Sequence, residues 1–437
     1  MTQIARRHQA LLCVLAVVLG AFGAGIARAL IAAISFCTNL FYFQTISFHD
    51  AKASDHHLGL LGISVPVLGG LIVGVMARYG SAAIRGHGIP EAMEKILLDE
   101  SRIPARIMFL KPISSAIAIG TGGPFGAEGP IIATGGAIGS WLGQLFPMTP
   151  FERKVLLSCG AAAGMTAIFG TPLAAVLLAI ELLLFEYRAQ SFIPVALAAV
   201  TASTLRSALW TNEPFFPMGP IAVATLTNLP VYLLSGVLFG VLSIFITKAV
   251  YWIEDQFEHL PLHWMWWPAI GGLAVGVIGW INPLTLGVGY SNIQSGLDGT
   301  VTTGVALGLV FWKFASWSIA LSSGTSGGTL APLMTLGSLS GAAVGIFLQN
   351  YFPSLGVDVH VLALLGMAAV FAGCSRALLA SVVFALEGTR QPAGLVPLLG
   401  TCAISYLISH WFMKNTIMTE KIARRGVRVP HEYVAHH

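Results

Sequence analysis

Three short segments of the chain combine glycines with a proline that is followed by a helix-forming run. They read Gly86-His87-Gly88-Ile89-Pro90, Gly126-Ala127-Glu128-Gly129-Pro130 and Gly328-Thr329-Leu330-Ala331-Pro332. Proline suits the first turn of a helix, because the N–H that it lacks would have no partner there, and glycine lets the backbone approach a ligand closely. A helix start leaves several backbone N–H groups free and carries about half a positive charge. Three such starts would bind a small anion without trapping it as a fixed cation would. Tight helix packing through small residues is the alternative interpretation.

Glu128 has the most specific chemistry of the residues in these segments. An ionised carboxylate inside a membrane is costly and is therefore a functional candidate. Beside helix N-termini it would act as a tethered anion that competes with a transported one, and protonation or competition would release it. We therefore predict that Glu128 gates the path, with a capping carboxylate at a helix start as the alternative.

The elements that must position these segments are membrane helices. Of the 437 residues, 55% are hydrophobic and 10% are charged, whereas a soluble domain carries about a quarter charged residues. The mean hydropathy of +0.79 agrees with a membrane protein. Disorder, a coiled coil and a nucleic-acid platform are excluded, and the net charge of +4 is too small to indicate a polyanionic partner. The five cysteines lie in apolar runs without metal-type spacing, which indicates buried thiols rather than disulfides or a metal site.

Both ends of the chain carry basic residues beside apolar runs. Arg6 and Arg7 precede a run that continues past the cleavage-like residues 27–29 to about Phe43. This length predicts a retained first membrane helix instead of a cleaved signal. The last apolar segment is followed by Lys421, Arg424, Arg425 and Arg428. Basic residues favour the cytoplasmic side, so we expect both ends in the cytoplasm and an even number of full crossings.

A repeat with a constant offset of 202 residues divides the chain into two halves. The offset pairs Lys111 with Lys313, Pro130 with Pro332, and Gly164-Met165 with Gly366-Met367. Duplicated halves of a membrane protein pack about a pseudo-two-fold axis with the transport site between them, and we favour an inverted repeat. The predicted organisation is a cytoplasmic N-terminus (1–9), a first repeat half (10–210), a connecting segment (211–228), a second repeat half (229–418) and a basic cytoplasmic tail (419–437).

The chain resembles the CLC family of chloride channels and chloride/proton exchangers. The three filter segments of that family read approximately G-S-G-I-P, G-(K/R)-E-G-P and G-x-F-x-P, and the three segments above match them in order and spacing. The likeness extends from the first apolar segment to the last. It implies transport of chloride by a homodimer with a pore in each subunit, with contact surfaces near 172–205 and 378–412. It implies no enzyme activity, cofactor, bound nucleotide or nucleic-acid partner.

The resemblance also assigns roles to individual residues. Glu128 falls at the family's gating glutamate. Lys111 and Lys313 fall at basic positions that raise the positive potential near the pore, with a lysine that snorkels to the membrane interface as the alternative. The implied anion-binding residues are Gly86, His87, Gly88, Ile89, Pro90, Gly126, Ala127, Gly129, Pro130, Gly328, Thr329, Leu330, Ala331, Pro332 and Met418.

Four of these positions depart from the family pattern. His87 stands where the family has a serine, Ala127 replaces a basic residue, and Leu330 replaces a phenylalanine. Met418 falls where a tyrosine hydroxyl completes the inner site, and Tyr406 is the alternative if the last helix is shifted. Because imidazole titrates near neutral pH, His87 is a candidate to donate to an anion, to carry protons or to make transport pH-dependent. A hydrogen-bonded packing histidine is the other interpretation.

The proton route of the family's exchangers is altered as well. Their internal proton-transfer glutamate should directly follow Glu181, but this chain has Leu182 there, and leucine cannot relay a proton. Glu181 and its counterpart Glu387 lie at the ends of apolar runs and are interpreted as interfacial or hydrogen-bonded structural carboxylates. The sequence therefore favours passive or weakly proton-coupled transport, with exchange by a different proton route as the alternative.

Two rival functions involve other chemistry. Gly324-Thr325-Ser326-Gly327 and His410 would fit an intramembrane serine protease, although the first repeat half has Pro124 at the position equivalent to Ser326. An altered filter would instead prefer fluoride, nitrate or bicarbonate to chloride. Our expectation is an all-α polytopic protein of the bacterial inner membrane, with two inverted-topology repeats and broken, re-entrant helices.

Overall fold

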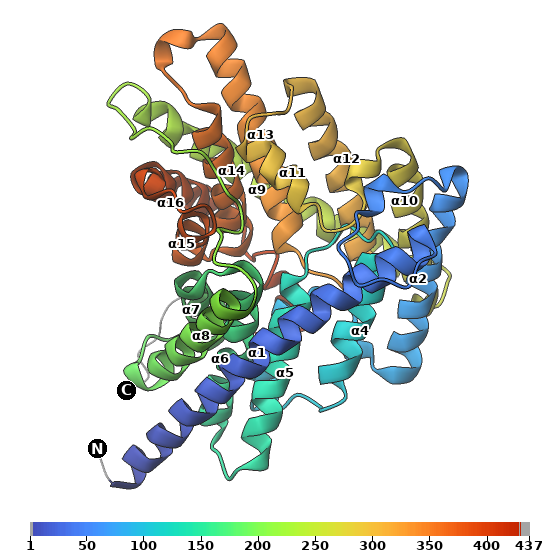
Figure 1. The fold of residues 1–437 in the computed structure, drawn as a ribbon, viewed down its shortest axis with the longest axis vertical. Coiled ribbons are helices and arrows are strands. Elements are labelled where there is room, and N and C mark those ends of the chain that lie inside the picture. Colours follow the sequence, from blue (N-terminus) through green and yellow to red (C-terminus); the bar gives the residue numbers. More distant parts are fainter. Residues whose placement is uncertain (1–2, 428, 430–437) are drawn as a thin grey trace.

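The computed structural model describes residues 3–427 and 429, which form helices joined by loops (Figure 1). The first eight helices are α1 (Gln3–Phe43), α2 (Ser64–Val75), α3 (Ile89–Leu98), α4 (Ile107–Gly120), α5 (Glu128–Leu145), α6 (Pro150–Phe169), α7 (Pro172–Ala179) and α8 (Ala189–Leu209). They are followed by α9 (Leu229–Glu258), α10 (Trp267–Ile281), α11 (Tyr290–Leu297), α12 (Thr303–Ser322), α13 (Leu330–Tyr351), α14 (Val359–Ser375), α15 (Leu378–Thr389), α16 (Leu395–Phe412) and α17 (Glu420–Arg424). Within the described residues, β-pairing is confined to two isolated bridges.

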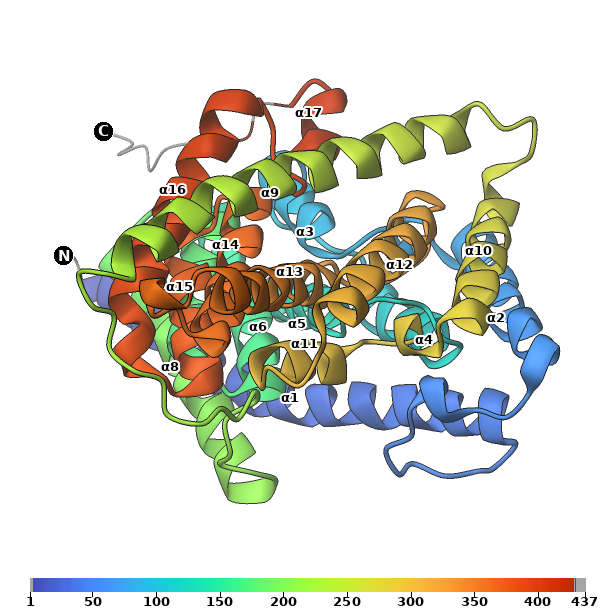
Figure 2. The ribbon, with the colours of Figure 1, turned by 90° about the horizontal axis from the view of Figure 1, so that it is seen from above.

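The packing of α1–α8 is repeated by α9–α16. Helix α5 lies against α6 as α13 lies against α14, and α1 packs on α6 and α8 as α9 packs on α14 and α16. In Figure 1 the first eight helices, coloured blue to green, fill mainly the lower part of the molecule, and the later helices fill the upper part. Figure 2 shows α1 and α9 along opposite sides. The structure therefore contains the two predicted repeats as two sets of eight helices with matching packing.

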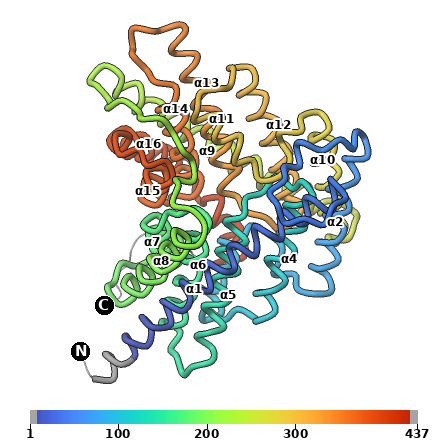
Figure 3. Tube along the Cα trace, in the orientation of Figure 1, coloured from blue at the N-terminus to red at the C-terminus, as the bar shows by residue number. Residues whose placement is uncertain are grey.

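A loop connects the eight helices α1–α8 to the helices that follow. Helix α8 ends at Leu209 and α9 begins at Leu229, and Figure 3 follows the connection between them. Helix α1 begins within the expected N-terminal segment 1–9, and α17 lies within the expected tail 419–437. Arg428 and residues 430–437 of that tail are outside the described residues.

Helix α1 is one continuous helix of 41 residues. It runs through the cleavage-like segment, where Ala27 is completely buried, and packs on α4, α6 and α8. The first apolar run is thus part of the fold, as expected for a retained helix. Among the described residues, eight helices are long and apolar enough to cross a membrane, and four apolar helices are shorter. A crossing needs about 20 helical residues, so the shorter helices are too short to cross the hydrocarbon layer on their own.

Glycines allow the central helices to touch backbone to backbone. A Cβ on Gly160 of α6 would lie 2.0 Å from the carbonyl oxygen of Gly135 in α5. In the second repeat, a Cβ on Gly366 of α14 would lie 2.2 Å from the carbonyl oxygen of Gly337 in α13. Small residues at such crossings are typical of membrane helix pairs. A close contact between two glycines therefore joins the paired helices in each repeat, although Gly160 and Gly366 are not equivalent by the 202-residue offset.

Gly366→Ala is expected to lower the free energy of unfolding by about 1–3 kcal/mol, because the added methyl group overpacks the α13–α14 crossing. Gly308→Ala in α12 is the matched control, since no atom lies within 4 Å of a Cβ at that position. Thermal unfolding of the detergent-purified variants measures the difference. Equal unfolding temperatures would show that the crossing is not close-packed.

Two carboxylates join the repeats reciprocally. Glu181 accepts hydrogen bonds from the backbone N–H groups of the second and third residues of α15, at 3.0 and 2.9 Å. Glu387 accepts hydrogen bonds from the second and third residues of α7, at 3.1 and 2.8 Å. Each carboxylate binds the positive end of a helix dipole in the other repeat. The interpretation of both as hydrogen-bonded structural carboxylates agrees with these contacts.

Candidate functional site

The three glycine-proline segments meet at the centre of the molecule. The Gly86 N–H donates to the Thr325 carbonyl at 3.1 Å, just before the third segment. Gly126 and Gly328 exchange two backbone hydrogen bonds of 3.2 and 3.0 Å as an antiparallel bridge. Because these two glycines are equivalent in the repeats, the antiparallel pairing places a local two-fold relation at the bridge. The segments precede α3, α5 and α13, so three helix starts converge.

Glycine is required where the segments touch. A Cβ on Gly129 would lie 2.1 Å from the carbonyl oxygen of His87 and 2.8 Å from Cα of Gly328. Gly88 has a φ of +94°, which L side chains rarely adopt, and a Cβ there would lie 2.3 Å from the Gly129 carbonyl oxygen. These distances leave no room for a side chain between the segments. The glycines therefore bring the three helix starts together.

Glu128 places its carboxylate at the N-terminus of a different helix. The residue opens α5 and is completely buried. Its Oε1 accepts a hydrogen bond from the Ala331 N–H in the first turn of α13. Its Oε2 accepts one from the Tyr290 hydroxyl at 3.3 Å. The carboxylate thus takes the position at which the α13 start would bind an anion.

Tyr290 is a contact of Glu128 that the sequence analysis missed. It opens α11 and follows Gly287-Val288-Gly289, which is the second-repeat counterpart of Gly86-His87-Gly88. This segment lacks the proline that drew attention to the other three, and it is shifted by one residue relative to the constant offset. The Gly-x-Gly pattern at a similar distance before Lys313 as before Lys111 was the available signal.

Lys111 and Lys313 support these glycine turns from within the protein. Lys111 Nζ donates to the carbonyls of Ile84 and Gly86, both at 2.8 Å. Lys313 Nζ donates to the two corresponding carbonyls before α11, at 2.9 and 2.8 Å. The side chains are 1% and 0% exposed, so the alternative of interfacial snorkelling is wrong. Both ammonium groups are held beside the segments, where their charge would act on a bound anion.

His87 lies between the two glycines of the first segment and is 5% exposed. Its Nδ1 is buried and has no hydrogen-bond partner among the described residues. A buried polar atom without a partner costs about 1–3 kcal/mol, so this nitrogen is a candidate to bind a transported species or water. A packing histidine would be hydrogen-bonded within the protein, but Nδ1 of this ring is not hydrogen-bonded to any described residue.

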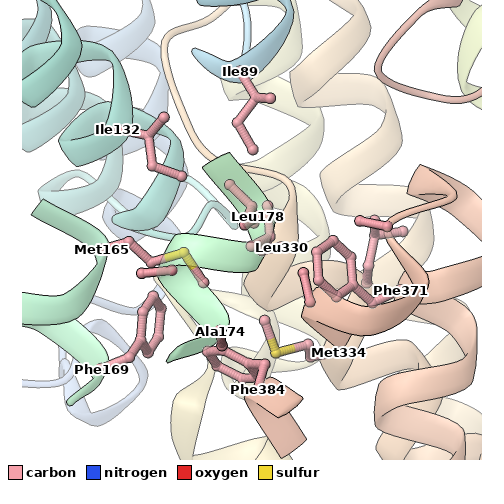
Figure 4. Close-up of a cluster of buried hydrophobic side chains, with 14 of the residues drawn as sticks. Ile89, Ile132, Met165, Phe169, Ala174, Leu178, Leu330, Met334, Phe371 and Phe384 are labelled. Carbon is pink, nitrogen blue, oxygen red and sulfur yellow. The ribbon is translucent and has the colours of Figure 1, made fainter. Parts of the chain in front are cut away.

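An apolar cluster lies beneath the helix starts. Figure 4 shows Ile89 of α3 and Leu330 of α13 within a buried group that includes Met165, Phe169 and Phe371. Ile89 and Leu330 are completely buried. Where water is excluded, the partial charges of the helix starts act more strongly on an anion.

A cavity of about 480 Å³ lies beside Glu128. Its wall is formed by one face of α1, the loop 50–54, Ala127 and residues that include Tyr290. Arg28 and Lys52 contribute two positive charges to this wall, and Asp50 contributes one negative charge. The cavity reaches the residue before Glu128 and the tyrosine that binds it, so it is suited to admit anions to the gate.

Met418 is buried in the turn between α16 and α17. The preceding residue, Ile417, donates its N–H to the Cys374 carbonyl at 3.0 Å and accepts from the Tyr251 hydroxyl at 2.8 Å. These bonds hold the turn against α14 and α9, and a role of Met418 in anion binding stays a prediction. Tyr406, the alternative, stacks on the exposed ring of His410 at 6.2 Å.

Ser326 and His410 do not form a catalytic pair. The Ser326 hydroxyl is completely buried and forms hydrogen bonds of 3.2 and 2.8 Å with the hydroxyls of Ser114 and Ser115 in α4. His410 lies on α16, at the opposite side of the molecule from α4 in Figures 1 and 2. A serine nucleophile needs a base within hydrogen-bond reach, so the protease hypothesis has no geometric support.

A family model described as voltage gated chloride channel matches residues 69–410. The chain belongs to the voltage gated chloride channel (CLC) family. The H(+)/Cl(-) exchange transporter ClcA of Yersinia pestis is 30% identical over 362 residues, which cover 80% of this chain and 74% of ClcA. ClcA of Salmonella typhi is 30% identical over 355 residues, which cover 78% of this chain and 74% of the relative.

Solved structures share the fold of this CLC protein. A slow cyanobacterial Cl-/H+ antiporter aligns with a TM-score of 0.84 at 22% identity, over 96% of this chain and 98% of that one. A CLC-type fluoride/proton antiporter aligns with a TM-score of 0.75 at 22% identity, over 94% and 98%. The expected CLC fold with two inverted-topology repeats is confirmed. The chain is a multi-pass membrane protein that transports anions, and membership of a transporter and channel family makes the protease hypothesis wrong.

Proposed function

We propose that the chain exchanges chloride for protons, along an anion path between the starts of α3, α5 and α13 that Glu128 gates. The curated relatives are named H(+)/Cl(-) exchange transporters, and the aligned structures include two antiporters. These names favour exchange over the passive or weakly coupled transport that Leu182 indicated. They also keep fluoride as an alternative to chloride.

The position of the Glu128 carboxylate carries this proposal. Its Oε1 accepts a hydrogen bond from the Ala331 N–H. A helix start offers this kind of donor to an anion. A proton that neutralises the carboxylate weakens this contact, and an anion that binds the N–H displaces it. Protons and anions therefore act on one position, which links their movements.

Passive anion conduction is the second candidate, and Leu182 is the observation that favours it. This side chain is 4% exposed and belongs to the apolar core. Neighbouring Glu181 has both carboxylate oxygens bound by the start of α15. Leu182 has no atom that can carry a proton, and Glu181 is held at the start of α15, so exchange needs another inner proton route.

Flux from liposomes distinguishes the two candidates. The purified protein is reconstituted with a chloride gradient, and chloride and proton movements are recorded together. Exchange predicts uphill proton movement driven by chloride, whereas chloride flux without proton movement would establish passive conduction. Repeating the assay with fluoride, nitrate and bicarbonate ranks the anions.

Tyr290→Phe is expected to raise anion flux about fivefold, because loss of a hydrogen bond of about 1 kcal/mol weakens the closed position of Glu128. Tyr232→Phe is the control, since that buried hydroxyl binds the Asp358 N–H instead. Chloride flux per reconstituted protein is the measurement. Unchanged flux in Tyr290→Phe would mean that the hydroxyl does not hold the gate.

We also propose a homodimer that uses α7, α8, α15 and α16, within the expected contact surfaces 172–205 and 378–412. Apolar side chains project from these helices, including Val200 at 57% exposure and Val396 at 63%. Each repeat contributes an equivalent helix pair, so a two-fold contact would join like surfaces. Native mass spectrometry of the purified protein tests this proposal, and a single-chain mass would reject it.

A further inference from the structure

A second carboxylate folds back on the first glycine segment. Glu91, in the first turn of α3, accepts a hydrogen bond from the Gly88 N–H through Oε2 at 2.6 Å. A Cβ on Gly86 would lie 2.0 Å from its Oε1. This Oε1 has no hydrogen-bond partner among the described residues and lies 3.7 Å from Lys421 Nζ of α17. The carboxylate therefore lies against both glycines that flank His87.

His87 and Glu91 are surrounded by few other titratable groups. The charged groups that face the His87 ring are Glu91 of α3, Lys111 of α4 and Lys421 of α17. Tyr251 of α9 faces Glu91 as well, and its hydroxyl is used by the Ile417 carbonyl. Lys111 donates to two carbonyls. His87 Nδ1 and Glu91 Oε1 are thus the buried side-chain atoms of this cluster without a hydrogen bond.

The half-buried carboxylates of Glu181 and Glu387 are bound to helix starts other than those of α3, α5 and α13. Glu181 and Glu387 each bind two backbone N–H groups of a helix start. A group that hands a proton on must lie within hydrogen-bond reach, directly or through one water, of its donor and its acceptor. Among the described residues, Glu91 and His87 are two titratable groups that each have a buried atom without a hydrogen bond beside the starts of α3, α5 and α13.

Glu91 is partly exposed to solvent, and His87 has its backbone beside the start of α5. The Glu91 side chain is 20% exposed and that of Lys421 is 29% exposed, whereas Glu128 is completely buried. Three basic residues, Lys421, Arg424 and Arg425, lie on or directly after α17, which assigns this side to the cytoplasm. The His87 carbonyl oxygen touches Gly129, the residue after Glu128. The backbone of His87 therefore lies beside the start of α5, and the Glu91 carboxylate, whose side chain is partly exposed although its Oε1 is buried, lies against the glycine before His87.

We propose that Glu91 and His87 form the inner proton route to Glu128, in place of a glutamate at the position of Leu182. The route rests on the proposed exchange function. Glu91 takes a proton from cytoplasmic water and gives it to His87, which leaves a carboxylate and an imidazolium. The imidazolium passes its proton, by way of water, to the Glu128 carboxylate and returns to neutral imidazole. Lys421 attracts the Glu91 carboxylate that the transfer to His87 leaves behind.

The test replaces each titratable side chain by a neutral one that can still form hydrogen bonds. Glu91→Gln retains an oxygen that accepts from the Gly88 N–H, and His87→Asn retains a polar atom near Nδ1. Glu94→Gln is the matched control, because Glu94 is one turn further along α3 and pairs with Arg425. Chloride and proton movements are recorded together in liposomes. A monodisperse peak in size-exclusion chromatography reports that each variant is folded, and His87→Gln is the second variant at that position.

The relay predicts that Glu91→Gln and His87→Asn each reduce the number of protons moved per chloride at least about tenfold. Glu94→Gln should keep the wild-type ratio. Wild-type ratios in both relay variants would overturn the route and leave the exchange function standing. A wild-type protein that moves chloride but no protons would overturn exchange itself, and the route with it.

Discussion

Glu128→Gln removes most of the pH dependence of anion flux and abolishes proton movement, while anion flux itself persists. In the wild-type protein, flux should rise as pH falls, because protonation releases the carboxylate from the Ala331 N–H. A gate opened by one proton follows proton concentration up to about tenfold per pH unit. Glutamine has nearly the same shape and no charge at any pH, so it competes weakly with an anion and carries no proton.

The control for this variant is Glu387→Gln. Glu387 also binds a helix start through two hydrogen bonds, at 3.1 and 2.8 Å, but that helix is α7 and not α13. Its substitution should leave the pH dependence intact even if it lowers stability. Chloride flux from liposomes across a range of pH is the measurement. A Glu128→Gln protein that retains the wild-type pH profile would remove Glu128 from the role of gate.

Gly129→Ala should reduce anion transport at least about 100-fold, since displacements of about 1 Å in a functional site have effects of this size. The added Cβ would lie 2.1 Å from the His87 carbonyl oxygen and 2.8 Å from Cα of Gly328. Both neighbours are backbone atoms and have no rotamer to change. The methyl group must therefore separate all three glycine-proline segments.

Gly136→Ala in the same helix is the matched control, because its Cβ would first meet the flexible end of Leu157 at 3.3 Å. Both variants are compared as flux per monodisperse protein after size-exclusion chromatography. Wild-type flux in Gly129→Ala would mean that the segments need not touch during transport.

The central part of the site was predictable because its elements have local signatures. Proline within the first turn and glycines beside it marked the starts of α3, α5 and α13, and the buried charge of Glu128 marked the gate. Membrane composition and the repeat predicted the all-helical fold with two halves. These features follow from backbone chemistry within a few residues, so one sequence suffices to find them.

The remaining contacts depend on distant parts of the chain. Tyr290 shares no motif with Glu128, and only the packing of α11 against the centre brings its hydroxyl to the carboxylate. Lys111 and Lys313 looked equally suited to the membrane interface, because a lysine stem is apolar, but carbonyls of preceding turns bind both ammonium groups. The contact of Glu91 with the Gly86–Gly88 turn likewise arises from backward folding of its side chain. Such pairings are set by tertiary structure, which spacing along the chain does not encode.

Locating an anion in the Glu128→Gln protein tests the central claim most directly. Crystals or frozen particles prepared in bromide would show the ion by its scattering, and removal of the competing carboxylate should leave the position open. We expect one bromide ion within hydrogen-bond distance of the Ala331 N–H, enclosed by the starts of α3, α5 and α13. Bromide bound elsewhere, with this convergence empty, would contradict the account.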